Sequence, residues 1–174
     1  NWLMLKYLIW IFLRFIRIRE RMYSKQWILL FHLRKGLSTS FWRYQKIIPP
    51  KDRFFADPFI IKKENKYFIF IEEFIYKNNK AHISVIEMEK NGKFKKPVKI
   101  IDQSYHLSYP FVFQYENDYY LIPETCNNRT IELYKCTEFP FKWKFKMNLI
   151  DNIDASDSTV FYYQDRWWLF ANII

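Results

Sequence analysis

The stretch Asp57-Pro58-Phe59-Ile60-Ile61, followed after a polar turn by Tyr67-Phe68-Ile69-Phe70-Ile71-Glu72, occurs in three related copies along the chain. The second copy runs from Tyr109 to Glu124 and the third from Asp157 to Phe170, and all three align without a gap. The copies begin 52 and then 48 residues apart. Self-similarity at this period in β-rich sequence is typical of a β-propeller, in which four-stranded sheets surround an axis. We therefore predict an all-β propeller with repeats starting near residues 57, 109 and 157.

Each copy reads as a β-hairpin, because two runs of aromatic and β-branched residues flank a short polar turn. Similar runs predict a third strand at 82–86 and 130–134, and a fourth, outermost strand at 94–101 and 143–150. Residues 41–48 occupy the fourth-strand position before the first copy. Another antiparallel sheet would also contain hairpins, but recurrence in register favours the propeller.

The predicted domain organisation is a basic amphipathic helix or linker over residues 1–25, followed by a partial propeller over residues 26–174. The repeats account for about three blades, and propellers use about four to eight. We therefore expect a fragment of a longer protein, with neighbouring domains of the same chain as partners.

The excess of positive over negative charge is confined to the first part of the chain. The net charge is +10, and residues 1–51 carry 11 Lys and Arg with a single acid, Glu20. Residues 52–174 carry 17 residues of each sign. Because the repeats have no excess charge for a phosphate backbone, we expect no nucleic-acid partner.

The basic opening segment alternates charge with apolar residues at helical spacing. Lys6, Arg14, Arg17 and Arg21 fall on one face, opposite Leu5, Ile9, Phe12 and Ile16. This pattern predicts that residues 1–21 lie on an anionic membrane surface, or that they form a linker helix packed on protein. Its longest uncharged run is too short to span a bilayer.

The two cysteines, Cys126 and Cys136, are too few for a disulfide framework and are expected to be reduced. They favour a cytoplasmic location, peripheral to a membrane if the basic segment binds lipid. No cluster of metal ligands is evident, and no metal or cofactor is expected.

The repeat geometry brings polar residues to one rim of the propeller, because the first strand of each hairpin begins where the second ends. Carboxylates beside aromatic rings are typical of a sugar-binding site, and a pair of acids is typical of a glycosidase active site. We predict catalytic roles for Asp57, Glu124 and Asp157, and substrate binding by Glu72, His106, Ser108, Tyr109 and Trp168. The alternative is structural, since the same carboxylates can bind backbone N–H groups and tie blades together.

The residues of this rim also carry a resemblance to a known family. The chain from about Trp27 onward is similar to the N-terminal domain of glucosamine inositolphosphorylceramide transferases. The matching segments are 55–59 with 70–73, 106–111 with 122–125, and 131–134 with 139–143. The resemblance implies five blades and a fold like that of the arabinanase, levansucrase and invertase clan of glycosidases.

In that clan the Asp that opens the first inner strand is the base or nucleophile, and Asp57 falls at this position. Tyr109 stands where the clan has a second Asp, and Asp157 where it has a Glu, which argues against hydrolysis. In plant members the transferase chemistry is ascribed to a separate C-terminal domain.

The leading hypothesis is therefore a carbohydrate-related domain of a larger glycan-processing protein, which binds a glycan or glycosylated acceptor at the propeller mouth. An active glycosidase or glycosyltransferase with Asp57 as base or nucleophile is the first alternative. A structural scaffold for an adjoining transferase domain is the second.

Overall fold

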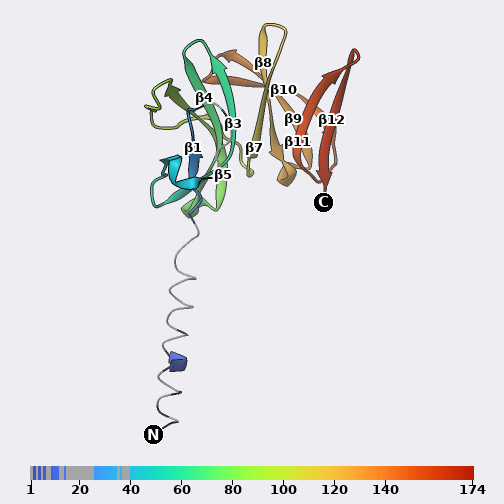
Figure 1. The fold of residues 1–174 in the computed structure, drawn as a ribbon. Helices are drawn as coiled ribbons and strands as arrows, with labels where there is room; N and C mark the ends of the chain where they lie inside the picture. Colours follow the sequence, from blue (N-terminus) through green and yellow to red (C-terminus); the bar gives the residue numbers. More distant parts are fainter. Residues whose placement is uncertain are drawn as a thin grey trace.

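The computed structural model describes residues 26–34, 36 and 40–174, together with the single positions 2, 4, 6, 9–11 and 14. The elements are β1 (Leu29–Phe31), η1 (Phe41–Arg43), β2 (Gln45–Ile47), β3 (Arg53–Lys63), β4 (Lys66–Ile75), η2 (Tyr76–Asn78), β5 (Lys80–Glu89), β6 (Val98–Ile101), β7 (Ser108–Tyr115), β8 (Asp118–Thr125), η3 (Cys126–Asn128), β9 (Thr130–Glu138), β10 (Lys142–Asp151), β11 (Ala155–Tyr163) and β12 (Arg166–Ile173). The labels are those of Figure 1.

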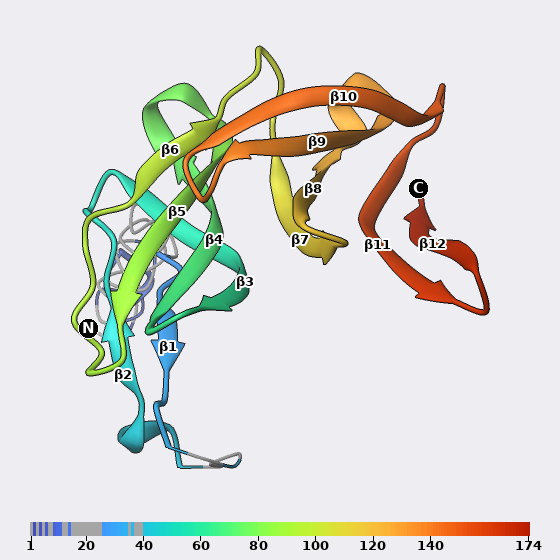
Figure 2. The same ribbon diagram turned by 90° about the horizontal axis from the view of Figure 1, so that it is seen from above.

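Two four-stranded antiparallel sheets follow each other along the chain. Sheet 1 contains β3 to β6 and sheet 2 contains β7 to β10, each in sequence order, and β11 pairs with β12 in a hairpin. The first strands of successive units, β3, β7 and β11, contact one another, and Figure 2 shows them on the inner side of an arc with β10 outside. The predicted all-β fold is confirmed, and closure into five blades stays a prediction.

Three apolar layers hold the units together. Successive side chains of a strand point to opposite faces of its sheet, so the two four-stranded sheets can present apolar side chains on both faces. The layer between sheets 1 and 2 contains Phe68, Phe70, Ile83, Val85, Leu107, Val112, Leu121 and Tyr134. The layer between sheet 2 and the β11–β12 hairpin contains Tyr120, Ile122, Ile131 and Leu133 with Val160 and Leu169. On its other face, sheet 1 packs Phe55, Ile69, Ile71 and Ile86 against Leu29 of β1 and Ile47 of β2.

The opposite face of the β11–β12 hairpin is exposed. Its aromatic side chains are Phe161, Tyr163, Trp168 and Phe170. The residues aligned with Trp168 and Phe170 in the first repeat are Phe68 and Phe70, which sheet 2 buries. A further sheet would cover this face in the same way, as the predicted propeller requires.

The N-terminal positions that the structure describes, among them Lys6, Ile9 and Arg14, are helical. The other residues on which the predicted amphipathic pattern depends (Leu5, Phe12, Ile16, Arg17 and Arg21) lie outside the described residues. Within the described residues, no helix has the length and apolar character needed to cross a membrane.

Candidate functional site

The first strand of each repeat contains a bulge at the same place. The register slips between Ala56 and Phe59, between Ser108 and Phe111, and between Ser156 and Thr159. Each bulge holds one residue in the left-handed region, with φ of 48° at Asp57, 43° at Tyr109 and 53° at Asp157. Asp tolerates this conformation, whereas a bulky residue such as Tyr109 is strained by about 1–2 kcal/mol. Strained bulges of this kind re-aim side chains and cluster at functional sites.

Carboxylates bridge neighbouring units at these bulges. The backbone N–H of Tyr109 in sheet 2 donates to Asp57 Oδ2 of sheet 1 at 3.2 Å. The backbone N–H of Asp157 in β11 donates to Glu124 Oε2 of sheet 2, also at 3.2 Å. Glu124 in turn lies opposite Ser108 in the β7–β8 register and bonds its side chain. One oxygen of each bridging carboxylate therefore holds the next unit in place.

His106 is oriented by two contacts in the connection that leads into β7. Its Nδ1 accepts a hydrogen bond from the backbone N–H of Ala81 at 3.2 Å, and its Nε2 lies 3.4 Å from Glu72 Oε1. Because a backbone N–H can only donate, Nδ1 is the unprotonated nitrogen and Nε2 carries the hydrogen toward Glu72.

Two acids of the site, Glu72 and Glu124, have environments that favour a proton. Burial raises the pKa of Glu72, and the neighbouring charge of Asp57 adds to this, while the contact with His106 opposes it. The side chains of Glu72 and Asp57 lie close enough to interact, and this contact also raises the pKa of Glu72. Burial likewise raises the pKa of Glu124, with the charge of Asp157 acting in the same direction. The site thus offers both hydrogen-bond acceptors and acids that can donate.

Tyr109 of sheet 2 contacts both sheet 1 and the third repeat. Its ring meets Phe59 edge to face at 5.0 Å between centroids, and its hydroxyl lies 3.2 Å from Thr159 Oγ1. Asn172 Nδ2 donates to Asp157 Oδ2 at 3.2 Å. The sequence interpretation did not select Asn172 or Thr159, although Asn172 is aligned with Glu72 and Glu124 and could have been found from that alignment.

These contacts connect seven of the predicted site residues, which we call the rim cluster: Asp57, Glu72, His106, Ser108, Tyr109, Glu124 and Asp157. Trp168 is not brought to it. Trp168 pairs with Phe161, four residues along β12 from Asn172, which corresponds to about 13 Å at strand spacing.

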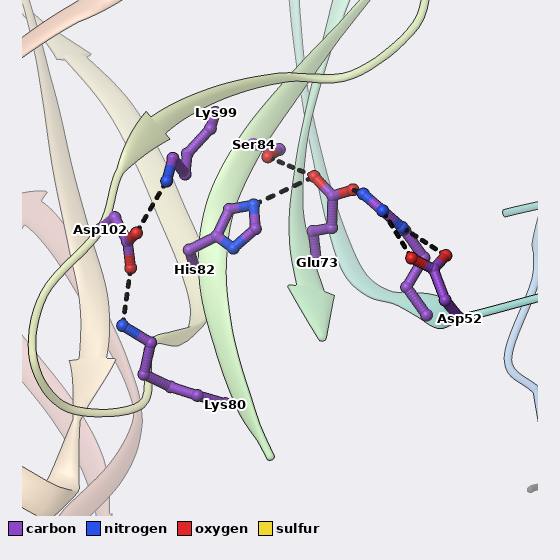
Figure 3. Close-up of polar contacts among 8 residues, drawn as sticks. Asp52, Glu73, Lys80, His82, Ser84, Lys99 and Asp102 are labelled. Carbon is purple, nitrogen blue, oxygen red and sulfur yellow. Dashed lines mark hydrogen bonds and ion pairs between the residues drawn. The ribbon is translucent and has the colours of Figure 1, made fainter. Parts of the chain in front are cut away.

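Glu73, next to Glu72, belongs to a separate buried network. Its Oε1 accepts from Arg53 at 2.7 Å, and its Oε2 accepts from Ser84 Oγ at 2.6 Å and lies 3.2 Å from His82 Nε2. Figure 3 shows Ser84 and His82 at Glu73, and apart from them Asp102 between Lys80 and Lys99. Burial raises the pKa of Glu73, but the bonds from His82, Ser84 and Arg53 outweigh it and lower the pKa to about 2. This arrangement stabilises an ionised carboxylate inside sheet 1 rather than presenting it to a ligand.

Sheet 2 places its buried carboxylate elsewhere. Thr125 is aligned with Glu73, and Glu132 is aligned with Ser84. Glu132 accepts from Tyr134 Oη at 2.6 Å and from Tyr105 Oη at 2.7 Å, and it also binds Asn128 and Thr130. Each sheet therefore holds a buried carboxylate in a network of hydrogen bonds, Glu73 on β4 in sheet 1 and Glu132 on β9 in sheet 2.

Among the residues that the structure describes, no group of three or more His, Cys, Asp and Glu side chains has an arrangement that would hold a metal ion. Cys126 and Cys136 are both free thiols.

The region that contains the repeats is also the region that matches known proteins. Residues 46–174 match the family model described as Glucosamine inositolphosphorylceramide transferase 1, N-terminal. The chain belongs to this family. Proteins named Glucosamine inositolphosphorylceramide transferase 1 from Oryza sativa, subspecies indica and japonica, are 37% identical to it over 120 residues, and one from Arabidopsis thaliana is 28% identical over 120 residues. No solved structure matches.

The family match covers every residue of the rim cluster and begins within β2. The aligned region covers 68% of this chain but 16% of each relative, so the chain spans about a sixth of the length of these transferases. The chain is thus a domain of a glycosyltransferase-associated family, and its resemblance to that family is confirmed.

Proposed function

We propose that this domain binds a glycan or glycosylated acceptor at the rim cluster, within a larger protein that carries out glycosyl transfer. The observation that carries the proposal is the convergence of carboxylates from two sheets and the third repeat around one strained tyrosine. The relatives' name joins an amino sugar, glucosamine, to inositolphosphorylceramide, which is the class of molecule that we expect the acceptor to resemble.

The chemistry of the rim cluster suits a sugar. The side-chain oxygens of Asp57 and Asp157 can accept hydrogen bonds from hydroxyl groups, while Glu72 or Glu124, whose pKa burial raises, can donate one when protonated. The Tyr109 ring supplies an apolar surface with a polar hydroxyl at its end, the combination that suits the mixed surface of a pyranose.

The bonds between units are compatible with this role. A carboxylate has two oxygens and about four acceptor positions, and the bond to a backbone N–H uses one of them. Asp57 and Glu124 can therefore hold the next unit and still bind a ligand. A purely structural role would need the same bridges but no ligand.

The test is glycan binding by the complete protein, first against an array of glucosamine- and inositol-containing glycans and then by titration calorimetry. Asp57→Asn and Glu124→Gln keep an oxygen for the backbone N–H but remove the charge, so the fold is retained. We expect each to weaken binding by about tenfold or more, the effect of losing a charged hydrogen-bond partner.

Asp102→Asn is the matched control, because Asp102 pairs with Lys80 and Lys99 on the surface of sheet 1, outside the rim cluster. Folded Asp57→Asn and Glu124→Gln variants that bind as tightly as this control would refute the proposal. If they also kept full transfer activity, the scaffold role would replace it.

Catalysis by the domain itself is the second candidate, favoured by the raised pKa of Glu124 beside Asp157. In this case Asp57 is the base or nucleophile, and Glu124 or Asp157 is the acid. It requires a bell-shaped dependence of rate on pH that disappears in Asp57→Asn. Glycan binding without such a rate profile would support the binding role alone.

A further inference from the structure

The end of the β1–β2 hairpin presents large aromatic side chains to solvent. Phe41 and Trp42 of η1 are 75% and 79% exposed. Figure 2 shows η1 beyond β1 and β2, away from the sheets. Leu33, also exposed, lies just past β1 on the same hairpin. Neither η1 aromatic belongs to any of the three apolar layers, so their exposure needs a different explanation.

Basic groups lie directly beside these aromatics. Arg34 and Arg43 line a groove of about 480 Å³ together with His32 and Trp42. The Arg43 guanidinium lies 4.8 Å from the centre of the Trp42 ring. The sequence contains no Asp or Glu between residues 21 and 51, and among the described residues no carboxylate pairs with either arginine.

The same association of ring and cation occurs at the described N-terminal positions. Lys6 Nζ lies 3.7 Å from the centre of the Trp2 ring, and the Arg14 guanidinium lies 5.0 Å from that of Trp10. Exposed Trp beside Arg or Lys is what a membrane interface requires, because the ring partitions into the headgroup region while the cation meets lipid phosphate.

We propose that the β1–β2 hairpin end docks on an anionic membrane surface, with Phe41 and Trp42 in the headgroup region and Arg34 and Arg43 on lipid phosphates. Charge complementarity carries the choice of partner, since residues 1–51 hold the entire net charge of +10. The exposed aromatics favour lipid over nucleic acid, because they present an apolar tip rather than a basic channel that follows a backbone. Such docking places the domain at the periphery of a membrane independently of the rim cluster.

The experiment is flotation of the complete protein with vesicles of phosphatidylcholine, alone or with about one third phosphatidylserine. We expect binding that requires phosphatidylserine and weakens as salt rises from about 0.15 M to about 0.5 M. F41S/W42S is expected to bind at least about tenfold more weakly. R34Q/R43Q is expected to bind about 25-fold more weakly, at about fivefold for each cation.

Matched controls come from the sheets. F145S removes an exposed aromatic from β10, and K62Q/K144Q removes two exposed cations, and we expect both to bind within about twofold of wild type. Far-ultraviolet circular dichroism checks that each variant is folded. Unchanged vesicle binding by folded F41S/W42S and R34Q/R43Q would overturn the proposal. So would binding of a single-stranded RNA oligonucleotide that is tighter than vesicle binding and is lost in the same variants.

Discussion

The buried carboxylate of Glu73 gives a prediction whose size follows from its surroundings. The pKa of Glu73 is lowered from its ordinary value of 4.5 to about 2 in the folded protein. A difference of this size corresponds to about 3 kcal/mol of the free energy of unfolding. Because the folded pKa is depressed, this contribution is present above about pH 5 and is lost as the pH falls through 4.5 toward 2. We expect Glu73→Gln to remove about 3 kcal/mol at pH 7 and to differ little from wild type near pH 2.

Urea denaturation at pH 7 and near pH 2.5 measures the difference, and thermal melting provides a second readout. For a chain of this size, 3 kcal/mol corresponds to a fall of about 6–12 °C in Tm at pH 7. Glu138→Gln is the control, since Glu138 is 67% exposed and pairs with Lys142 on the surface, where an ion pair contributes little. A loss below about 1 kcal/mol at pH 7, or an equal loss at both pH values, would refute the account of Glu73 as a stabilising buried anion.

Three further results are expected. Asp57→Ala removes the acceptor for the Tyr109 N–H and places a residue without a polar side chain in the left-handed region. In the same urea assay it should lower the free energy of unfolding by about 2 kcal/mol, and Asp57→Asn should lower it by less than half of that. The raised pKa of Glu72 makes the free energy of unfolding of wild type fall as the pH rises from 4 to 7, so Glu72→Gln should become more stable relative to wild type over this range. A stability difference between the two proteins that does not change with pH would contradict the raised pKa. Burial raises the pKa of both thiols, that of Cys136 to about 11, so alkylation at pH 8 followed by mass spectrometry should find Cys136 slower than in urea and slower than Cys126.

The fold was predictable because its strands repeat in register. The predicted third strands at 82–86 and 130–134 lie within β5 and β9. The predicted fourth strand at 94–101 contains β6 and Phe94, which forms a bridge with Met88, and the one at 143–150 lies within β10. β1 was missed because its three residues, 29–31, have no counterpart in the repeats. Its pairing with β2 depends on contacts that the local pattern does not contain.

The rim cluster was predictable for a geometric reason, since a hairpin brings the start of one strand beside the end of the next. Trp168 lies near the turn of its hairpin and away from the rim cluster, and its role in substrate binding stays a prediction. Its selection depended on residue type alone. The exchange between Glu73 and Glu132 was not predicted, because it depends on side-chain partners: those of Glu73 lie on β3 and β5, and those of Glu132 lie on β9, in η3 and in the connection before β7.

The left-handed backbone at Tyr109 could have been inferred. Tyr109 is aligned with Asp57 and Asp157, residues that tolerate this conformation, and the three positions share one backbone shape. The sequence pattern reports only the change of residue type. The strain at Tyr109 arises because the bulge is conserved within the chain while the side chain differs.

The displacement of the buried carboxylate from β4 in sheet 1 to β9 in sheet 2 has a consequence for engineering. Consensus design averages aligned positions over repeats and treats each position separately. At the two positions concerned, sheet 1 has Glu73 and Ser84, and sheet 2 has Thr125 and Glu132. An averaged repeat that took the acid at both positions would bury two facing carboxylates, and one that took neither would leave the surrounding donors without an acceptor. A regular propeller built from this sequence must therefore inherit these positions as a pair.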